Sequence, residues 1–144
     1  MHRAVLDSSV LISAFLTPRG VPGRVLDAAE RGDLILCLSA EILAETATAL
    51  LNSAKLQARY GYDHAAVEAF CDGLTAVAEM VGALPTLQAV PNDPKDDMVV
   101  ATAVAAKAGH LVTGDRKHLL SLGGYQGIRI VTPRAFLDLL GERG

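Results

Sequence analysis

Four acidic residues stand at or near the ends of short apolar runs in this 144-residue chain. They are Asp7, Glu45, Asp97 and Asp115. Carboxylates packed together repel one another, and burial or a like charge raises their pKa values unless a cation lies nearby. Hard divalent ions such as Mg²⁺ or Mn²⁺ prefer oxygen ligands and relieve that repulsion. Ions held in this way activate a water molecule and neutralise charge on a phosphodiester. The pattern therefore predicts metal-assisted phosphodiester hydrolysis.

Several of the acids also have a simpler explanation. Asp93 followed by Pro94 is typical of a helix N-cap and first helical residue, and acids in a first turn interact favourably with the helix dipole. Asp115 likewise fits an N-cap. Glu41 lies one turn before Glu45 on nearly the same helical face, and periodicity does not choose between them. The joint placement of the acids is what favours a functional site.

The elements that must position these acids alternate along the chain. Strands are predicted at residues 3–6, 34–38, 110–113 and 128–131, with a further short strand within 81–90. Helices are predicted at residues 10–15, 22–31, 63–80 and 93–108, near 115–120 and from 133 onward. A further helix is predicted to begin at Ser39 and to carry apolar positions up to Leu51, and the pattern is broken at residues 60–62. This alternation predicts an α/β fold with a mostly parallel central sheet and helices on both faces. Ligands bind outside the carboxyl ends of the strands in such sheets, which is where the acids are expected.

Composition limits the remaining possibilities. With 51% hydrophobic residues and no low-complexity tract, residues 1–144 are expected to form a single domain. The net charge of −3 gives no global attraction to nucleic acid but leaves a local basic patch possible. Cys37 and Cys71 form neither a disulfide framework nor a zinc pattern. No apolar run approaches the roughly 20 residues of a membrane span, so a cytoplasmic protein is expected.

Taken together, these motifs resemble the PIN-domain family, specifically the toxin-like branch in which a PIN nuclease is paired with an antitoxin. The resemblance covers essentially the whole chain and rests on residues 5–14, 39–45, 92–97 with Ala101, 111–115 and 130–137. It implies a PIN-like three-layer sandwich and a Mg²⁺- or Mn²⁺-dependent ribonuclease that acts on RNA. It also implies frequent dimerisation and inhibition by an antitoxin, whose arginine can pair with the acids that otherwise hold metal.

The resemblance also assigns roles to individual residues. The family's acidic site corresponds here to Asp7, Glu45, Asp97 and Asp115. Ser9 and Thr113 correspond to its hydroxyl-bearing neighbours. Asp97 is preferred over Asp96 because it stands four residues before Ala101, as the family's acid does. Asp93 and Asp96 are then left with capping or supporting roles.

Contacts to RNA require positive charge near this edge. Arg116 and Lys117, directly beside the last acid, are the predicted phosphate contacts. Arg19, Arg24 and His118 fall in segments near the same edge. The histidines have no metal-ligand spacing, and no ligand role is predicted for them.

The main alternative is a catalytically silent PIN scaffold that binds RNA or a partner protein. The full set of acids argues against it, since a binding surface has no use for clustered carboxylates. A phosphoacceptor receiver domain would need Lys-Pro after the last strand, where this chain has Thr132-Pro133. A dinucleotide-binding domain would need a GxGxxG motif after the first strand, which is absent from the sequence.

Overall fold

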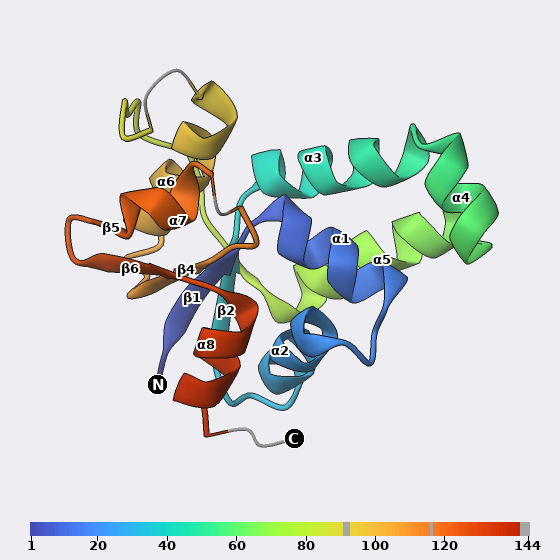
Figure 1. Cartoon of the computed structure of the whole chain (residues 1–144), viewed down its shortest axis with the longest axis horizontal. Coiled ribbons are helices and arrows are strands. Elements are labelled where there is room, and N and C mark those ends of the chain that lie inside the picture. The colour runs from blue at the N-terminus through green and yellow to red at the C-terminus, as the bar shows by residue number, and fades with distance from the viewer. Residues whose placement is uncertain (91–92, 116, 142–144) are drawn as a thin grey trace.

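The protein is described by a computed structural model over residues 1–90, 93–115 and 117–141. Its strands are β1 (Arg3–Leu6), β2 (Ile35–Leu38), β3 (Glu79–Met80), β4 (His110–Val112), β5 (Gly124–Tyr125) and β6 (Ile128–Val131). They form one sheet in the order β3-β2-β1-β4-β6-β5 (Figure 1). Neighbouring strands run parallel except β5 and β6, which are antiparallel. The predicted, mostly parallel sheet is confirmed.

Helices cover both faces of this sheet. They are α1 (Ser8–Leu16), α2 (Val21–Glu30), α3 (Ala40–Leu51), α4 (Ala54–Tyr60), α5 (His64–Val77), α6 (Pro94–Ala105), α7 (Leu119–Leu122) and α8 (Pro133–Leu139). Helix α6 packs against β1, β2 and β4. On the other face of the sheet, α1 packs against α2, and α2 packs against α8 (Figure 1). Helix α3 leaves the sheet, α4 turns the chain, and α5 returns beside α3. No helix in the described ranges is long and apolar enough to cross a membrane.

The central strands are buried because helices cover both of their faces. Val5 and Leu6 in β1, Leu36 in β2, and Leu111 and Val112 in β4 are each at most 1% exposed. Burying each such side chain contributes about 1.5–3 kcal/mol to folding. Strands covered on both sides appear in the sequence as continuous apolar runs, which is why these strands could be predicted.

Predicted caps begin three of the helices. The Asp93 side chain accepts a hydrogen bond from the backbone N–H of Asp96 at 3.1 Å, and Pro94 opens α6. Ser39 caps α3 and Asp63 caps α5 in the same way. Each cap satisfies a backbone N–H that the first turn of a helix leaves without a partner.

The strand predicted within residues 81–90 is wrong. That segment forms no strand, and the partner of β2 is β3, which falls where the preceding helix was expected to continue to residue 80. Helix α5 instead ends at Val77. Strand β3 is two exposed residues long and pairs through its backbone, so no apolar run marks it in the sequence.

Two further elements were not predicted. Helix α4 begins after Ser53, whose hydroxyl accepts a hydrogen bond from the backbone N–H of Leu56 at 3.1 Å. Strand β5 pairs with β6 across a tight turn at Gln126 and Gly127, whose φ angles are 48° and 84°. Two consecutive positive φ angles are typical of a hairpin turn whose twist matches its strands.

The strand order reverses between β1 and β4. The chain leaves β1 for β2 on one side and comes back through α6 to β4 on the other. Leu6 pairs with Val112, and the backbone N–H of Asp7 donates to the Val112 carbonyl at 3.1 Å. Such a reversal leaves a crevice at the carboxyl ends of the two strands, where ligands bind in open α/β sheets. The residues just after β1 and β4 therefore share the expected ligand position.

Candidate metal centre

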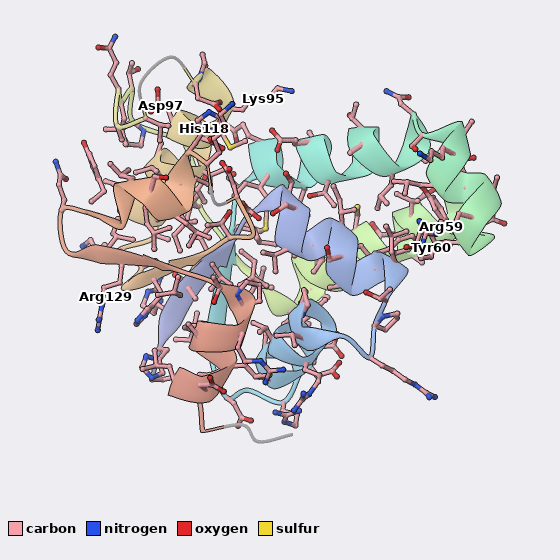
Figure 2. The ribbon with its side chains drawn as sticks, viewed as in Figure 1. Arg59, Tyr60, Lys95, Asp97, His118 and Arg129 are labelled. Atoms are coloured by element: carbon pink, nitrogen blue, oxygen red, sulfur yellow. The ribbon has the colours of Figure 1, made fainter. Side chains whose placement is uncertain are left out.

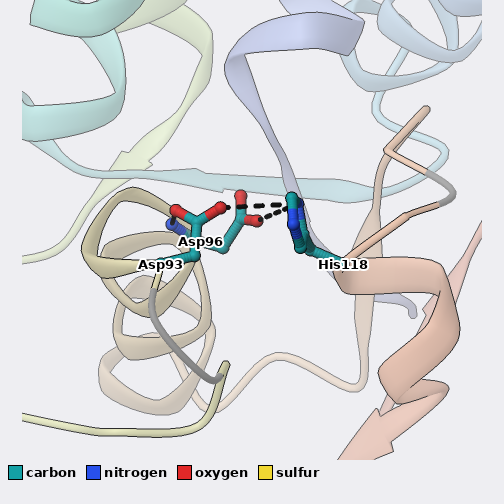
Figure 3. Close-up of side chains that lie close together, drawn as sticks. All are labelled: Asp93, Asp96 and His118. Atoms are coloured by element: carbon teal, nitrogen blue, oxygen red, sulfur yellow. Dashed lines mark hydrogen bonds and ion pairs between the residues drawn. The ribbon is translucent and has the colours of Figure 1, made fainter.

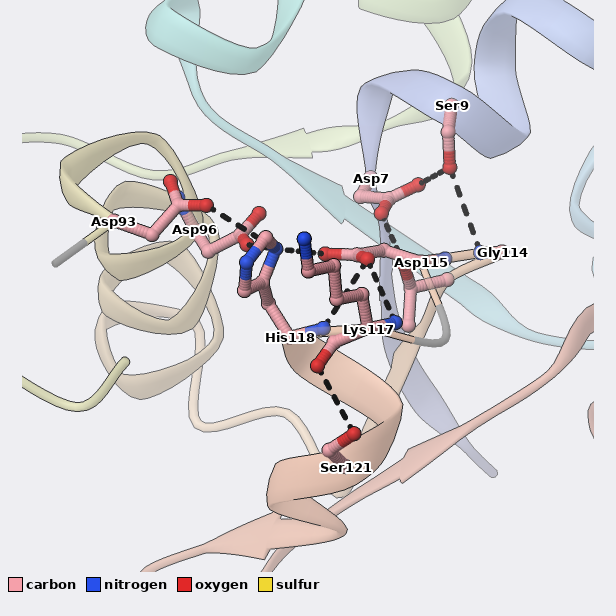
Figure 4. Close-up of polar contacts among 10 residues, drawn as sticks. Asp7, Ser9, Asp93, Asp96, Gly114, Asp115, Lys117, His118 and Ser121 are labelled. Atoms are coloured by element: carbon pink, nitrogen blue, oxygen red, sulfur yellow. Dashed lines mark hydrogen bonds and ion pairs between the residues drawn. The ribbon is translucent and has the colours of Figure 1, made fainter. Parts of the chain in front are cut away.

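Asp7 is a buried carboxylate held in place at both oxygens. It caps α1, where its Oδ1 accepts hydrogen bonds from the Val10 backbone N–H at 3.0 Å and from the Ser9 hydroxyl at 2.6 Å. Its Oδ2 accepts a hydrogen bond from the Thr113 hydroxyl, and Figure 4 shows the contact between Asp7 and Ser9. Burial raises the pKa of Asp7, and these hydrogen bonds act in the opposite direction. The chain thus fixes a carboxylate in a position that disfavours its charge.

The two hydroxyl residues named from the sequence connect β1 to the loop after β4. The Thr113 hydroxyl accepts a hydrogen bond from the Asp115 backbone N–H at 3.0 Å, in addition to donating to Asp7. The Ser9 hydroxyl is 3.4 Å from the Gly114 backbone N–H that donates to it. This network links Asp7 to the backbone that carries Asp115.

Asp115 uses one oxygen to organise its own loop. Its Oδ1 accepts hydrogen bonds from the backbone N–H groups of Lys117 at 3.2 Å and His118 at 3.3 Å. Burial acts to raise the pKa of Asp115, but hydrogen bonds, chiefly those from the His118 backbone and with Asp96, hold this pKa below its ordinary value. Asp115 therefore favours its charged form at neutral pH.

The pKa of Asp96 is shifted in the opposite direction to that of Asp115. Burial, followed by the neighbouring carboxyl groups of Asp93 and Asp115, raises the pKa of Asp96 from 3.8 to about 8. Its Oδ2 atom is buried and has no hydrogen-bond partner among the described residues. By contrast, the hydrogen bond from the Asp96 backbone is the main cause that lowers the pKa of Asp93. Asp96 is thus a partly buried acid whose pKa is raised both by burial and by its carboxyl neighbours.

His118 lies among these carboxylates (Figure 3). Its Nδ1 atom is 3.4 Å from Oδ2 of Asp93, 3.6 Å from Oδ2 of Asp96 and 3.6 Å from Oδ2 of Asp115. No ligand role was predicted for this histidine, because the histidines have no metal-ligand spacing in the sequence. Two of its neighbours, Asp93 and Asp96, lie at the start of α6, more than 20 residues earlier in the chain. The one local signal was Asp115 three residues before it.

Glu45 approaches the same region from α3. The hydroxyl of Ser8, the residue after Asp7, donates a hydrogen bond to Oε1 of Glu45. Glu45 is half-buried, whereas Glu41 is exposed one turn earlier. Of the two glutamates that periodicity left open, the structure brings Glu45 to the start of α1. Its proposed role as a metal ligand stays a prediction.

The structure places Asp97 differently from the sequence expectation. Its Oδ1 accepts a hydrogen bond from the Val90 backbone N–H at 2.6 Å, and its side chain lines a pocket that Ala101 also lines. Successive helical residues are about 100° apart, so Asp97 and Ala101 share a face that Asp96 does not. Within the described ranges it is therefore Asp96, and not Asp97, that lies beside Asp115.

The predicted RNA contacts are only partly placed. Lys117 is exposed next to Asp115. Arg116 lies outside the described residues. Lys95, near the start of α6, is also exposed and was not singled out from the sequence (Figure 2).

The comparisons with known proteins decide the family. The profile of a PIN domain family matches residues 3–117, which is most of the chain and includes Asp7, Glu45, Asp93, Asp96 and Asp115. The chain belongs to the PIN domain family.

Two further similarities agree with this PIN fold. A protein of Methanocaldococcus jannaschii, named only as uncharacterized protein MJ1680, is 26% identical, with 94% of this chain and 90% of that protein covered. One chain in the crystal structure of VapBC2 from Rickettsia felis bound to a DNA fragment from their promoter superposes with a TM-score of 0.60 and 15% identity. That match covers 90% of this chain and 98% of the other. At such low identity it supports the fold alone.

The residues of this PIN domain fit a divalent cation. Asp93, Asp96 and His118 each offer one ligand atom, and these atoms all lie within 4.8 Å of one another. The buried Oδ2 of Asp96 has no hydrogen-bond partner among the described residues and faces this group. Carboxylate oxygens are the donors preferred by Mg²⁺ and Mn²⁺, and a cation here would compensate the charge that raises the pKa of Asp96.

Proposed function

We propose that this PIN domain is a metal-dependent endoribonuclease that hydrolyses RNA phosphodiester bonds, and that it is the toxin of a toxin–antitoxin pair. Members of the family are typically nucleases. The observation that carries the proposal is the gathering of carboxylates from β1, α6 and the loop after β4 at the point where the strand order reverses. One of them, Asp96, has a buried Oδ2 atom without a hydrogen-bond partner among the described residues.

The proposed metal ligands are Asp7, Asp96 and Asp115, with Glu45 at the rim. Asp96 replaces Asp97 in this set because of the side of α6 on which it lies. A bound Mg²⁺ or Mn²⁺ would supply an activated water and would neutralise charge on the scissile phosphate.

The chain's own polar groups have separate tasks in this proposal. The Ser9 and Thr113 hydroxyls hold the Asp7 carboxylate in one orientation. The exposed ammonium groups of Lys95 and Lys117 flank the acids and would contact RNA phosphates, as would the predicted Arg116. These contacts position a strand without reading its sequence.

The partner in this proposal is an antitoxin that covers the acidic site. An antitoxin arginine would form charge-assisted hydrogen bonds with the same carboxylates that hold metal. The fold similarity to a chain of VapBC2, which was crystallised bound to a DNA fragment from its promoter, supports the proposal of a protein partner. Formation of a homodimer and a cytoplasmic location belong to the same proposal.

The test is RNA cleavage by purified, antitoxin-free protein in Mn²⁺ or Mg²⁺, with EDTA and Asp7→Asn as the two ways to remove activity. Asparagine is as good an N-cap as aspartate, so Asp7→Asn is expected to fold. We expect cleavage to fall at least roughly 100-fold in that variant, because even losing the groups that orient metal ligands costs 10–100-fold. Asp138→Asn, at an exposed position of α8, is the matched control and keeps full activity.

Wild-type protein that cuts none of a varied set of RNAs and shows no metal binding by calorimetry would overturn the proposal. A silent PIN scaffold that binds RNA or protein would then take its place.

A further inference from the structure

Three carboxylates direct the same kind of oxygen atom at one imidazole nitrogen. The Oδ2 atoms of Asp93, Asp96 and Asp115 lie 3.4, 3.6 and 3.6 Å from Nδ1 of His118 (Figure 3). These distances exceed those of ordinary hydrogen bonds between nitrogen and oxygen. The three oxygens thus surround the imidazole nitrogen at distances longer than a direct hydrogen bond.

The second oxygen of two of these carboxylates, Oδ1, is hydrogen-bonded to the backbone, and this bond fixes the position of the side chain. Oδ1 of Asp93 accepts the backbone N–H of Asp96 at the start of α6. Oδ1 of Asp115 accepts the backbone N–H groups of Lys117 and His118 (Figure 4). Each of these two carboxylates is thus anchored to backbone through one oxygen and leaves the other for the cluster. Asp96 adds a buried Oδ2 with no hydrogen-bond partner in the described part of the chain.

The spacing suits donors arranged around a metal ion. A six-coordinate ion with bonds of about 2.1 Å holds neighbouring donors about 3 Å apart and opposite donors about 4.2 Å apart. The observed separations of 3.4 and 3.6 Å fall between these values, and the atoms of Asp93, Asp96 and His118 all lie within 4.8 Å. Small side-chain rotations are enough to reach ligand geometry.

We infer that His118 and Asp93 are metal ligands, and that with Asp96 they form a nitrogen-containing cation position next to Asp115. This inference rests on the proposed function only for the presence of a divalent cation. It adds His118 and Asp93 to the metal ligands proposed above. Imidazole nitrogen favours transition metals over Mg²⁺, which prefers oxygen donors. The position therefore selects Mn²⁺ over Mg²⁺.

Pulsed electron paramagnetic resonance of bound Mn²⁺ tests this directly, because a coordinated imidazole gives a nitrogen coupling. Untagged protein is required, since a polyhistidine tag would supply nitrogen ligands. We expect the coupling in wild type and its loss in His118→Gln, with Mn²⁺ affinity falling roughly tenfold or more and Mg²⁺ affinity changing by less than about threefold. His64→Gln, an exposed histidine on α5, is the matched control and keeps the coupling.

A second measurement does not depend on how the variants fold. Wild-type protein containing histidine labelled with the heavy nitrogen isotope should show the isotopic change in the coupling. Asp93→Asn, which keeps the helix cap, should weaken Mn²⁺ binding while the coupling to His118 persists.

The outcomes separate this inference from the proposed function. Mn²⁺ that binds to wild type without nitrogen coupling, or with coupling that survives in His118→Gln, would overturn the role of His118 and leave a carboxylate-only nuclease site. Mn²⁺ affinity unchanged in Asp93→Asn would remove Asp93 from the ligand set. Protein that binds no Mn²⁺ would overturn the inference and the proposed function together.

Discussion

The amino and carboxyl edges of the central sheet partner their charged side chains in opposite ways. At the amino edge the Arg3 guanidinium lies 2.7 Å from Glu79 Oε1 and donates to the Ala106 carbonyl at 2.7 Å. Nearby, the His110 ring packs against Phe136 with centroids 5.3 Å apart. Opposite charges are paired there, and rings fill the space. That edge has the character of a structural region.

The carboxyl edge gathers like charges. Asp93, Asp96 and Asp115 surround a single partly exposed His118, and the pKa of Asp96 is raised to about 8. The raised pKa of Asp96 means that its ionised form makes the folded state less stable unless a cation is bound. A local arrangement that opposes stability, at the edge where ligands bind in open α/β sheets, supports the proposed function. The contrast predicts that substitutions at the amino edge mainly change stability, whereas substitutions at the carboxyl edge change metal binding.

The largest expected effect on stability lies at the amino edge. Phe136 is fully buried and packs against His2 and His110. Phe136→Ala leaves a cavity and is expected to lower the free energy of unfolding by about 3–5 kcal/mol. Urea denaturation monitored by circular dichroism measures this loss. A loss below about 1 kcal/mol would mean that this edge does not stabilise the fold.

Metal binding is expected to produce the next largest effect. Mn²⁺ at 100 times its Kd should raise the free energy of unfolding by about 2.7 kcal/mol, because it binds only the folded state. Thermal melts with and without Mn²⁺ measure the gain, which should vanish in Asp96→Asn and persist in Asp97→Asn. Equal gains in both variants would show that the side of α6 facing Asp115 does not bind the ion.

Without metal, Asp96 is expected to make stability depend on pH. Its folded-state pKa of about 8 lies above the ordinary 3.8, so the folded protein keeps a proton that the unfolded chain releases. Stability from this group is present below pH 4 and is lost as the pH rises toward 8. In EDTA at pH 8, Asp96→Asn should be more stable than wild type by about 2 kcal/mol, and this gain should shrink at pH 5. Urea denaturation at both pH values measures the gain, and identical pH profiles for the two proteins would contradict the prediction.

The smallest expected effect comes from His110. Burial, followed by the charges of His2 and Arg129, lowers the pKa of His110 below 6.5. The unfolded chain therefore takes up this proton first, and stability is lost as the pH falls below 6.5. His110→Phe keeps an aromatic ring against Phe136 but cannot titrate. The fall in melting temperature between pH 7 and pH 5 should be smaller in this variant than in wild type by roughly 1–2 °C. A fall in the variant that equals or exceeds that of wild type would contradict the role given to His110.

The fold could be predicted from the sequence wherever burial leaves a pattern. Strand β1 and strand β6 fall at the predicted residues because a strand in the core needs apolar side chains. Strand β3 could not be predicted, because its two exposed residues are selected by pairing with β2 and not by their own character. The break at Ser53 depends on a cap inside a helical pattern, which is weaker than the surrounding apolar periodicity.

The sequence predicts which segments contribute residues to the candidate site, but it does not predict which side of α6 faces that site. Asp7, Ser9 and Thr113 were placed together correctly, since the ends of parallel strands meet. The proposal of Asp96 in place of Asp97 depends on how α6 is rotated on the sheet, which its buried residues set and which the acidic run alone does not show. His118 was missed as a cluster member because its neighbours belong to a distant segment.

The central claim is that the acids facing Asp115, and not those facing the 81–90 segment, form a metal-dependent catalytic site. Mn²⁺-dependent RNA cleavage by Asp96→Asn and Asp97→Asn tests it most directly, because the two substitutions are chemically identical and adjacent on one helix. In Asp97→Asn the amide oxygen of the new side chain can still accept the hydrogen bond from the Val90 backbone, so both variants should fold. We predict that Asp96→Asn loses cleavage at least roughly 100-fold while Asp97→Asn stays within about threefold of wild type. An inert Asp97→Asn beside an active Asp96→Asn would contradict the claim.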